Sequence, residues 1–307
     1  MHTENMRFLV FAVLLGSAML ARAEKMIIID NQSGYILDST EPNARVPVAS
    51  LTKVATAIVA IDAESVGKIK WNQMVTVPAS AVRNATTNTS GLQEGDVLSI
   101  RDLLYCAMLA SDNVAANTVA HHVGLKLENS TNLQPIANFV SHMNALARSL
   151  KMRNTRFLNP SGLDTGKGTP PYSTAADMAR LTRYAYTRPG FHFFVEQRER
   201  VVEVIRDEQK IPIQIKNTNE LLGQENIDGV KTGRTRRAGD CLILSSELPP
   251  EVKRDGSTAY ITPRRITVVL LDSQNRFPRG LSLVKQGWQR YNQWAAQGRP
   301  VTQQTML

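Results

Sequence analysis

The chain has 307 residues, of which 42% are hydrophobic and 21% are charged. These proportions are ordinary for a globular protein and exclude a disordered or collagen-like chain, while the length allows one large domain or two modest ones. The formal net charge of +9 is compatible with nucleic acid, an anionic membrane surface or an anionic polymer. Because no run of five basic residues occurs and aromatic residues make up only 6%, we expect no nucleic-acid partner.

The beginning of the chain is typical of an export signal. Residues 8–20 form an apolar run, with Arg7 before it and the small-residue pattern Ala21-Arg22-Ala23 after it. This run is shorter than the about 20 residues that span a bilayer. We therefore expect a secretory signal peptide at residues 1–23, cleaved after Ala23. The alternative is an uncleaved anchor. No second apolar run of membrane length follows, so we expect the mature chain to be soluble once it is exported.

Cys106 and Cys241 are the only cysteines, and they are 135 residues apart. Two cysteines at this distance make neither a disulfide scaffold nor a metal site. Each lies in an apolar run, which favours buried free thiols over a bridge. A metal site is not expected elsewhere, because the adjacent His121 and His122 would point about 100° apart on a helix.

Two short strands open the mature chain, and helices follow them. Residues 26–29 and 35–38 are β runs with turn chemistry between them, which predicts a hairpin. Apolar residues then recur at helical spacing in several stretches. These stretches predict helices over residues 50–63, 100–110, 114–123, 135–150 and 174–187.

Strand character returns after Arg200. The predicted strands lie at residues 201–205, 211–215, 227–233, 241–246 and 265–271, and a last helix is predicted over residues 280–296. The economical packing is an α+β fold, in which an antiparallel sheet is built from both chain ends and a helical lobe is inserted between them. No internal repeat and no linker marks a second domain.

Ser50-Leu51-Thr52-Lys53 is the first motif with chemical meaning. Residues three apart lie on one face of a helix, so the hydroxyl of Ser50 and the amine of Lys53 can meet. Free N–H groups at the helix start favour developing negative charge. A neutral Lys53 could then remove the proton of Ser50, if its surroundings lower its pKa. Taken alone the motif is weak, since an N-cap serine followed by a solvated lysine is the ordinary explanation.

Two further motifs are equally weak when each is taken alone. Ser111-Asp112-Asn113 follows an apolar helix, and a helix stop followed by an N-cap explains it. Lys231-Thr232-Gly233 reads as a turn between strands or as a strand edge that holds a substrate carboxylate. At such an edge Gly233 would let a ligand backbone approach closely.

The order and the spacing of the three motifs decide between these explanations. S-x-x-K precedes S-D-N by about 60 residues, and K-T-G follows about 120 residues later. Serine-reactive penicillin-binding enzymes and β-lactamases carry this set of motifs. Because all three occur in that order, on a predicted helix, loop and strand, we favour the catalytic interpretation.

The chain resembles the low-molecular-mass penicillin-binding proteins of the D-alanyl-D-alanine carboxypeptidase type. Besides the motifs, the segments VPVASLTKVATAIVA, SIRDLLYCAMLASDNVAAN, NTRFLNPSGLD, YSTAADMARL and IDGVKTGRTRRAG look like that family's, and the resemblance covers about residues 25–290. It implies a β-lactamase- or transpeptidase-like fold for a single peptidase domain at residues 24–307, without a cofactor. It also implies a location in the periplasm or cell wall, and action on peptidoglycan stem peptides that end in D-Ala-D-Ala.

The resemblance also implies the chemistry at the nucleophile. Ser50 resembles the residue that is acylated by substrates and by β-lactam inhibitors, and Lys53 resembles its base. Ser111 resembles the hydroxyl that relays a proton, and Asn113 the amide that holds the substrate's peptide group.

Substrate-binding roles follow from the same resemblance. Lys231 would set the charge around Ser111, and Thr232, beside Gly233, would bind the terminal carboxylate. The backbone N–H groups of Ser50 and Arg234 would form the oxyanion hole. Arg276 would meet the carboxylate together with Thr232, since an arginine fork can bond both oxygens. Its competitors are Arg279 and the cluster Arg234, Arg236 and Arg237.

The chain departs from the family pattern at several points. Arg234 stands where the family often has histidine, which leaves a backbone donor intact but could alter specificity. The carboxypeptidases commonly carry an extra β-rich C-terminal domain and an amphipathic membrane helix. We expect no extra C-terminal domain here, although peripheral association with the membrane or wall stays open. A compact exported chain also fits the D,D-endopeptidase branch, which cleaves cross-links.

Three rival functions are weaker. A class A β-lactamase requires a glutamate roughly 35 residues after S-x-N, and that window reads FVSHMNALAR, without one. A non-catalytic wall-binding protein would not need both Ser50 and Lys53. A metal hydrolase lacks a suitable histidine pattern.

Overall fold

A computed structural model describes residues 24–129, 132–164 and 168–307. The predicted signal peptide at residues 1–23 lies outside the described residues, so its prediction stays open. No helix within the described ranges is long and apolar enough to cross a membrane.

The first strand, β1 (Lys25–Asp30), is buried on both of its faces. Ile27 and Ile29 pack into a core shared with the helical lobe, while Met26 and Ile28 pack into a second core against the C-terminal helix. Successive side chains of a strand point to opposite faces, so a strand covered on both sides has no polar face. This explains why the segment is a continuous apolar run in the sequence.

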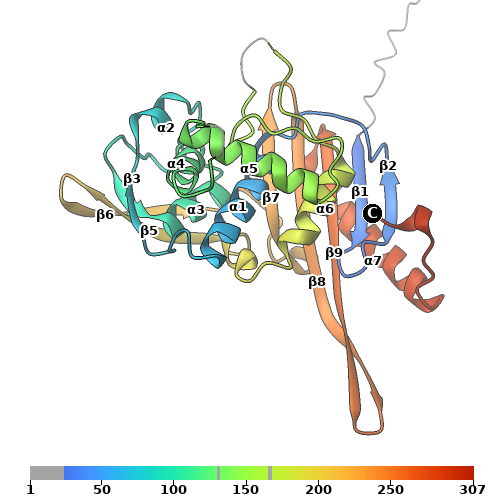
Figure 1. Cartoon of the computed structure of the whole chain (residues 1–307). Helices are drawn as coiled ribbons and strands as arrows, with labels where there is room; N and C mark the ends of the chain where they lie inside the picture. Colours follow the sequence, from blue (N-terminus) through green and yellow to red (C-terminus); the bar gives the residue numbers. More distant parts are fainter. Residues whose placement is uncertain (1–23, 130–131, 165–167) are drawn as a thin grey trace, which may run out of the picture.

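The central sheet has five antiparallel strands in the order β2-β1-β9-β8-β7. Besides β1 they are β2 (Ile36–Thr40), β7 (Ile227–Thr235), β8 (Gly239–Asp255) and β9 (Thr258–Ser273). The two chain ends meet where β1 pairs with β9, with Met26 opposite Leu270. This pairing confirms the prediction of a sheet built from both ends of the chain. β7 lies at the edge of the sheet that faces the helical lobe (Figure 1).

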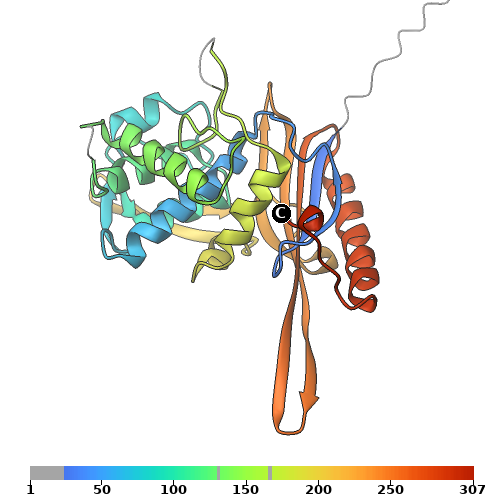
Figure 2. The same cartoon turned by 45° about the vertical axis from the view of Figure 1, so that its right-hand side comes forward.

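Helices cover both faces of this sheet (Figure 2). The lobe and its neighbour on one face comprise η1 (Ala49–Thr52), α1 (Lys53–Ser65), α2 (Ala79–Arg83), α3 (Ile100–Met108), α4 (Asn113–Gly124), α5 (Pro135–Ser149), α6 (Ala175–Ala185) and η2 (Phe191–Phe194). On the other face lies α7 (Arg276–Ala296), with the short turns η3 (Gln224–Asn226) and η4 (Gln303–Thr305) elsewhere. Ser99, Asp112 and Thr174 cap α3, α4 and α6 through their side chains, which fixes where these helices begin.

A second, smaller sheet lies at the far side of the helical lobe (Figure 1). Its strands are β3 (Met74–Thr76), β4 (Val97–Ser99), β5 (Glu199–Arg206) and β6 (Gln209–Lys216), in that order. β5 and β6 were predicted as strands correctly, but the expectation that they join the central sheet is wrong. Instead, β5 and β6 pair with each other, and β5 pairs with β4. A local sequence pattern indicates a strand but does not specify a partner strand far away in the sequence, so this pairing could not be predicted.

The hairpin of β8 and β9 extends well beyond the central sheet (Figure 2). Its strands pair as far as Asp255 and Thr258, with a bulge between Leu248 and Glu251. Val252, Tyr260 and Ile261 on this extension are exposed. The sequence pattern predicted strands only over residues 241–246 and 265–271, because three prolines and several charges interrupt the apolar run between them.

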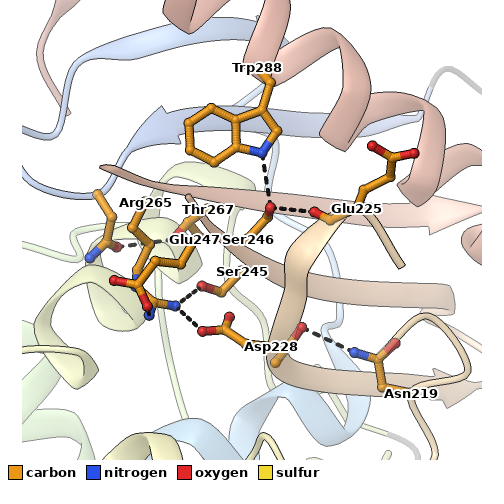
Figure 3. Close-up of polar contacts among 11 residues, drawn as sticks. Asn219, Glu225, Asp228, Ser245, Ser246, Glu247, Arg265, Thr267 and Trp288 are labelled. Atoms are coloured by element: carbon orange, nitrogen blue, oxygen red, sulfur yellow. Dashed lines mark hydrogen bonds and ion pairs between the residues drawn. The ribbon is translucent and has the colours of Figure 1, made fainter. Parts of the chain in front are cut away.

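A partly exposed ion-pair cluster holds the base of this hairpin to β7 (Figure 3). Arg265 donates to Asp228 at 2.6 Å, to Ser245 at 2.5 Å and to Glu247 at 2.5 Å. Its guanidinium also lies 4.2 Å from the centre of the Tyr186 ring. One guanidinium therefore links β7, β8 and β9 to one another and to Tyr186 at the end of α6.

Two smaller expectations have clear outcomes. The last helix begins at Arg276, four residues before the predicted start. Cys106 and Cys241 are free and buried, as predicted. Burial raises the pKa of each of these thiols to about 12.

Candidate active site

The S-x-x-K motif forms a short 3-10 turn that leads directly into a helix. Ser50 lies within η1, and Lys53 is the first residue of α1. The Nζ atom of Lys53 lies 2.9 Å from the Oγ atom of Ser50. The alternative of an N-cap serine followed by a solvated lysine is wrong, because Lys53 is fully buried and Ser50 caps neither helix.

Strained backbone holds the turn that carries Ser50. Ala49, immediately before it, has a positive φ of 49°, a conformation that is costly for a residue with a side chain. The carbonyl oxygen of Ala49 packs against Gly162, where an added Cβ would lie only 1.9 Å away. Gly162 also has a φ of 81°. The loop that contains Pro160 and Ser161 can therefore approach the turn only because residue 162 is glycine.

Three acceptors surround the amine of Lys53. Its Nζ atom donates to Ser50 Oγ at 2.9 Å, to Asn113 Oδ1 at 2.7 Å and to the carbonyl oxygen of Ser161 at 3.0 Å. Burial lowers the pKa of Lys53 from 10.5 to about 7, an effect that the nearby carboxylate of Asp112 opposes. Near neutral pH a large fraction of this amine is uncharged, so it can accept the proton of a hydroxyl at 2.9 Å.

Two residues of the S-D-N motif have different roles: Asp112 caps a helix, and Asn113 contacts Lys53. Asp112 is the N-cap of α4 and accepts the backbone N–H of Ala115 at 2.8 Å, so the capping explanation holds for this residue. Its other carboxylate oxygen accepts the N–H of Ser90 at 2.8 Å. Asn113, the first residue of α4, is buried and contacts Lys53. The cap therefore fixes the amide that meets the amine.

Ser111 is placed beside this cluster without a direct bond to it. It has a φ of 60°, in the left-handed region, and lies in the short link between the end of α3 and the start of α4. Among the described residues, no hydrogen bond joins its hydroxyl to Ser50, Lys53 or Lys231. Its predicted role as a proton relay stays a prediction.

The K-T-G motif lies inside β7 and not in a turn, so the interpretation as a turn is wrong. A Cβ on Gly233 would lie 3.1 Å from the backbone nitrogen of Ser50 and 3.2 Å from Cβ of Ala49. Glycine thus lets the edge strand approach the nucleophile turn. The hydroxyl of Thr232 shares a hydrogen bond of 2.6 Å with the hydroxyl of Thr218, which lies just after the end of β6.

Lys231 is buried without a hydrogen-bond partner for its Nζ atom among the described residues. Burial lowers its pKa well below the ordinary value, and the charges of Lys53 and Arg276 lower it further. A buried amine without a partner is costly. The position is therefore one that an acceptor from outside the chain would stabilise.

Arg276 reaches K-T-G from the first turn of α7. Its guanidinium donates to the carbonyl oxygen of Gly233 at 3.0 Å and lies 3.4 Å from Asp240 Oδ1. β8 lies between β7 and β9. The strand that carries K-T-G is therefore not a direct neighbour of the strand that leads to Arg276. Arg276 nevertheless spans that distance. Its Nε atom is buried and has no partner within the described ranges.

The competing arginines are engaged elsewhere or exposed. Arg279 pairs with Glu24 at 2.5 Å, and Arg237 donates to the carbonyl oxygen of Gly168 at 3.1 Å. The side chain of Arg234 is 77% exposed and lies 3.3 Å from Asp240. The structure thus brings Arg276 to the motif, and its carboxylate-binding role remains a prediction.

Four residues around the site were not singled out from the sequence. Ser161 supplies a backbone acceptor to Lys53, Thr218 meets Thr232, and Asp240 lies between two arginines. Asp112 adds a buried negative charge. The only available signal was that Asp112 and Ser161 lie in segments that look like those of the family. A backbone acceptor has no side-chain signature at all.

Comparisons with known proteins agree with this geometry. The profile of the D-alanyl-D-alanine carboxypeptidase family, peptidase S11, matches residues 16–249. A D-alanyl-D-alanine endopeptidase of Pseudomonas aeruginosa is 30% identical over 225 residues, which are 72% of this chain and 66% of that protein. The carboxypeptidase DacF of Bacillus subtilis is 29% identical over 232 residues, which are 75% of this chain and 56% of that protein. The chain thus spans between half and two thirds of the length of these relatives.

Solved structures share the fold. A penicillin-binding protein homologue from Mycobacterium tuberculosis has a TM-score of 0.71 at 27% identity, and the match covers 87% of this chain and 91% of that one. A penicillin-binding protein from Listeria monocytogenes, solved with cefotaxime bound, has a TM-score of 0.67 at 24% identity over 86% of this chain and 96% of that one. The second likeness concerns the fold alone. By its sequence match across most of its length, the chain belongs to the D-alanyl-D-alanine carboxypeptidase family.

Proposed function

We propose that this chain is a serine-type D-Ala-D-Ala carboxypeptidase that acts on peptidoglycan stem peptides through an acyl-enzyme on Ser50. One observation carries the proposal: the buried amine of Lys53 lies 2.9 Å from Ser50 Oγ, and its pKa is lowered to about 7. Membership of the family and the carboxypeptidase names among the relatives support the reaction class. No cofactor takes part in this chemistry.

Acylation begins when neutral Lys53 takes the hydroxyl proton of Ser50. Oγ then attacks the carbonyl carbon of the penultimate D-alanine, and backbone N–H groups of Ser50 and Arg234 stabilise the oxyanion. The C–N bond breaks, and the leaving D-alanine accepts a proton through the hydroxyl of Ser111. Water later hydrolyses the ester on Ser50 and releases the shortened peptide.

Substrate binding uses the edge strand and the two buried cations beside it. Asn113 holds the substrate's peptide group, while the peptide backbone lies along β7 next to Gly233. Thr232 and Arg276 bind the terminal carboxylate. That carboxylate also supplies an acceptor to Lys231, whose amine has none among the described residues, and a second anion to Arg276 besides Asp240, which gives binding an electrostatic contribution.

β-Lactams acylate the same serine in this proposal. Their carbonyl and carboxylate groups present the same two features as the peptide, an electrophilic carbon and an anion. The cefotaxime-bound structure of the Listeria protein concerns a chain of the same fold, and it supports this choice of inhibitor class.

The alternative function is that of a D,D-endopeptidase, which cleaves cross-links between stem peptides. One specific observation favours it: relatives from Pseudomonas aeruginosa and Escherichia coli, each 30% identical, are named D-alanyl-D-alanine endopeptidases. The same acyl-enzyme would form on Ser50, and only the leaving group would differ.

We further propose that the protein is exported and acts in the periplasm or cell wall. Residues 1–23 would serve as a cleaved signal peptide. Removing Glu4, Arg7 and Arg22 with it changes the net charge from +9 to +8 (+9 − 2 + 1), which would favour peripheral contact with the anionic membrane surface or wall. Fractionation of cells, with the mass of the mature N-terminus, tests this point. A mature chain that retains residues 1–23 would contradict cleavage.

Two experiments test the proposed function. Intact-mass measurement with penicillin should show one adduct, carried by the peptide that contains Ser50, and no adduct on Ser50→Ala. An adduct that persists in Ser50→Ala would exclude this serine as the nucleophile. Digestion of pentapeptide and cross-linked muropeptides then separates the two activities. Loss of one alanine indicates a carboxypeptidase, and conversion of dimers to monomers indicates an endopeptidase.

A further inference from the structure

A second pocket lies in the helical lobe, apart from the residues of the candidate active site. It has a volume of about 640 Å³, which is within the range of small-ligand sites. Its walls come from α2, α4, the start of α5 and the segment at residues 156–158. Ile136, Val140 and Phe157 supply apolar surface, and Asn84, Asn144 and Arg156 supply polar groups. Figure 1 shows α2, α4 and α5 gathered in one part of the lobe.

The charge of this pocket is positive. None of its described lining residues is aspartate or glutamate. Arg156 is exposed, and its guanidinium forms no ion pair within the described ranges. The positive end of α5 adds to this field, because its N-cap residue Gln134 makes no side-chain cap and also lines the pocket. Burial and the neighbouring His122 lower the pKa of His121, which favours the neutral ring.

Short stretches of chain connect the pocket to the active site. Leu158 lines the pocket, and Ser161, three residues later, accepts the amine of Lys53. Asn84 lines it as well, and the carbonyl of Thr87, three residues later, accepts the N–H of Asn113 at 3.2 Å. Three residues of extended chain span about 11 Å. Leu158 and Asn84 therefore lie within about 11 Å of Ser161 and Thr87, a distance that a peptide of a few residues spans.

We propose that this pocket binds a carboxylate-bearing stretch of the stem peptide whose scissile bond lies at Ser50. The inference rests on the proposed function. Stem peptides carry free carboxylates along their length besides the terminal one, next to methyl and methylene groups. An arginine without an ion pair, a helix start and an apolar wall match that combination. The pocket would then distinguish whole stem peptides from short dipeptide ends.

The test measures how peptides compete with penicillin for Ser50. The readout is the peptide concentration that halves the acylation rate, so it does not depend on which bond the enzyme cleaves. The peptides are L-Ala-γ-D-Glu-meso-diaminopimelyl-D-Ala-D-Ala, the same peptide with its internal carboxylates amidated, and diacetyl-L-Lys-D-Ala-D-Ala. The variants are Arg156→Gln, which removes the charge, and Ala137→Trp, which fills the pocket from an exposed helical position. Arg101→Gln, an exposed arginine outside the pocket, is the matched control.

We expect Arg156→Gln and Ala137→Trp to weaken competition by the carboxylate pentapeptide about ten-fold, the scale of one charge-assisted hydrogen bond. Competition by diacetyl-L-Lys-D-Ala-D-Ala should stay unchanged, and amidation should remove the effect of Arg156→Gln. Equal effects of Arg101→Gln and Arg156→Gln, or unchanged competition in both pocket variants, would overturn the pocket site. A wild-type protein that penicillin never acylates would instead overturn the proposed function, so the two failures are distinguishable.

Discussion

Basic side chains lie at two places along β7, one beside Asp228 near its start and one around Lys231 in its middle, and their charges are balanced in opposite ways. At one end Arg265 is held by the carboxylates of Asp228 and Glu247, at 2.6 and 2.5 Å. In the middle of β7, Lys231 has no partner for its amine within the described residues, and burial, together with the charges of Lys53 and Arg276, lowers its pKa. A cation that serves folding alone is neutralised within the chain. A cation that waits for a ligand is left short of counter-charge, and folding carries that cost.

The largest expected effect is that of Lys53→Ala on chemistry. A positioned general base contributes about 10²–10⁴ in rate, so acylation of Ser50 by penicillin should fall by that factor. The melting temperature should not fall in parallel, because the change removes a buried amine that burial already disfavours. Stopped-flow acylation with calorimetry checks both. Lys68→Ala, at an exposed lysine, is the control, and near-normal acylation of Lys53→Ala would refute its role as base.

Arg265→Met should lower the free energy of unfolding without changing the rate at which Ser50 is acylated. Arg265 and Asp228 are half-buried and Glu247 is exposed; removing the guanidinium leaves Asp228 and Ser245 without their donor, which costs about 1.5–3 kcal/mol. Denaturant unfolding should show this loss, while any folded protein still reacts with penicillin at the wild-type rate. Lys210→Met removes the exposed pair with Glu203 and should change the free energy of unfolding by less than about 1 kcal/mol. Equal losses in the two variants would contradict the distinction.

The pH dependence of acylation tests whether the neutral amine of Lys53 is the general base. Lys53 must be neutral to act, and its pKa is about 7, so the acylation rate should fall about ten-fold per pH unit below that value. Stability should respond as well. The unfolded chain binds a proton at Lys53 up to pH 10.5 that the native state has released above about 7, so this group makes stability rise with pH across that window. A flat acylation profile between pH 5 and 8 would exclude Lys53 as the titrating base.

Arg276→Ala tests whether the partly balanced cation reads a carboxylate. Turnover of a peptide that ends in free D-alanine should weaken by about 1.5–3 kcal/mol, the range of a charge-assisted hydrogen bond. A peptide with an amidated end should be barely affected. If both substrates lose equally, Arg276 does not bind the carboxylate.

The smallest effect is expected from Asp240→Asn. Asp240 lies between Arg276 at 3.4 Å and Arg234 at 3.3 Å, so it positions the guanidinium without touching substrate. Its loss should raise KM for the carboxylate-ended peptide a few-fold and leave kcat and the amidated peptide unchanged, about 1 kcal/mol for a partly exposed pair. A fall in kcat alone would argue against a positioning role.

Much of the fold could be predicted because local patterns and their order agree. Helix starts follow from capping residues such as Asp112 and Thr174, and the apolar run of β1 reflects its burial on both faces. Sheet membership could not be predicted in full. The alternating residues of β5 and β6 indicate strands, but nothing in them specifies β4 as the partner. Nor does a segment with Pro249 and Pro250 reveal that β8 continues as a projecting ribbon.

The candidate active site could likewise be predicted in part from the sequence. Ser50, Lys53 and Gly233 were identified because motif order is visible in sequence, and the structure brings them together. The acceptor of Ser161 and the isolation of Lys231 were not, because both depend on which backbone and which charges surround a side chain after folding. Such surroundings are a property of packing and leave no signature at the residue itself.

The burial of Cys106 and Cys241 has a consequence for redox chemistry. With a pKa of about 12 for each thiol, only about one thiol in 10⁵ is a thiolate at pH 7, and the thiolate is the nucleophile that attacks disulfides and reacts with oxidants. The native protein should therefore resist alkylation by iodoacetamide, whereas the unfolded chain should take up two equivalents. A chain with this arrangement can enter an oxidising compartment with both sulfurs reduced, because packing alone keeps them out of reach.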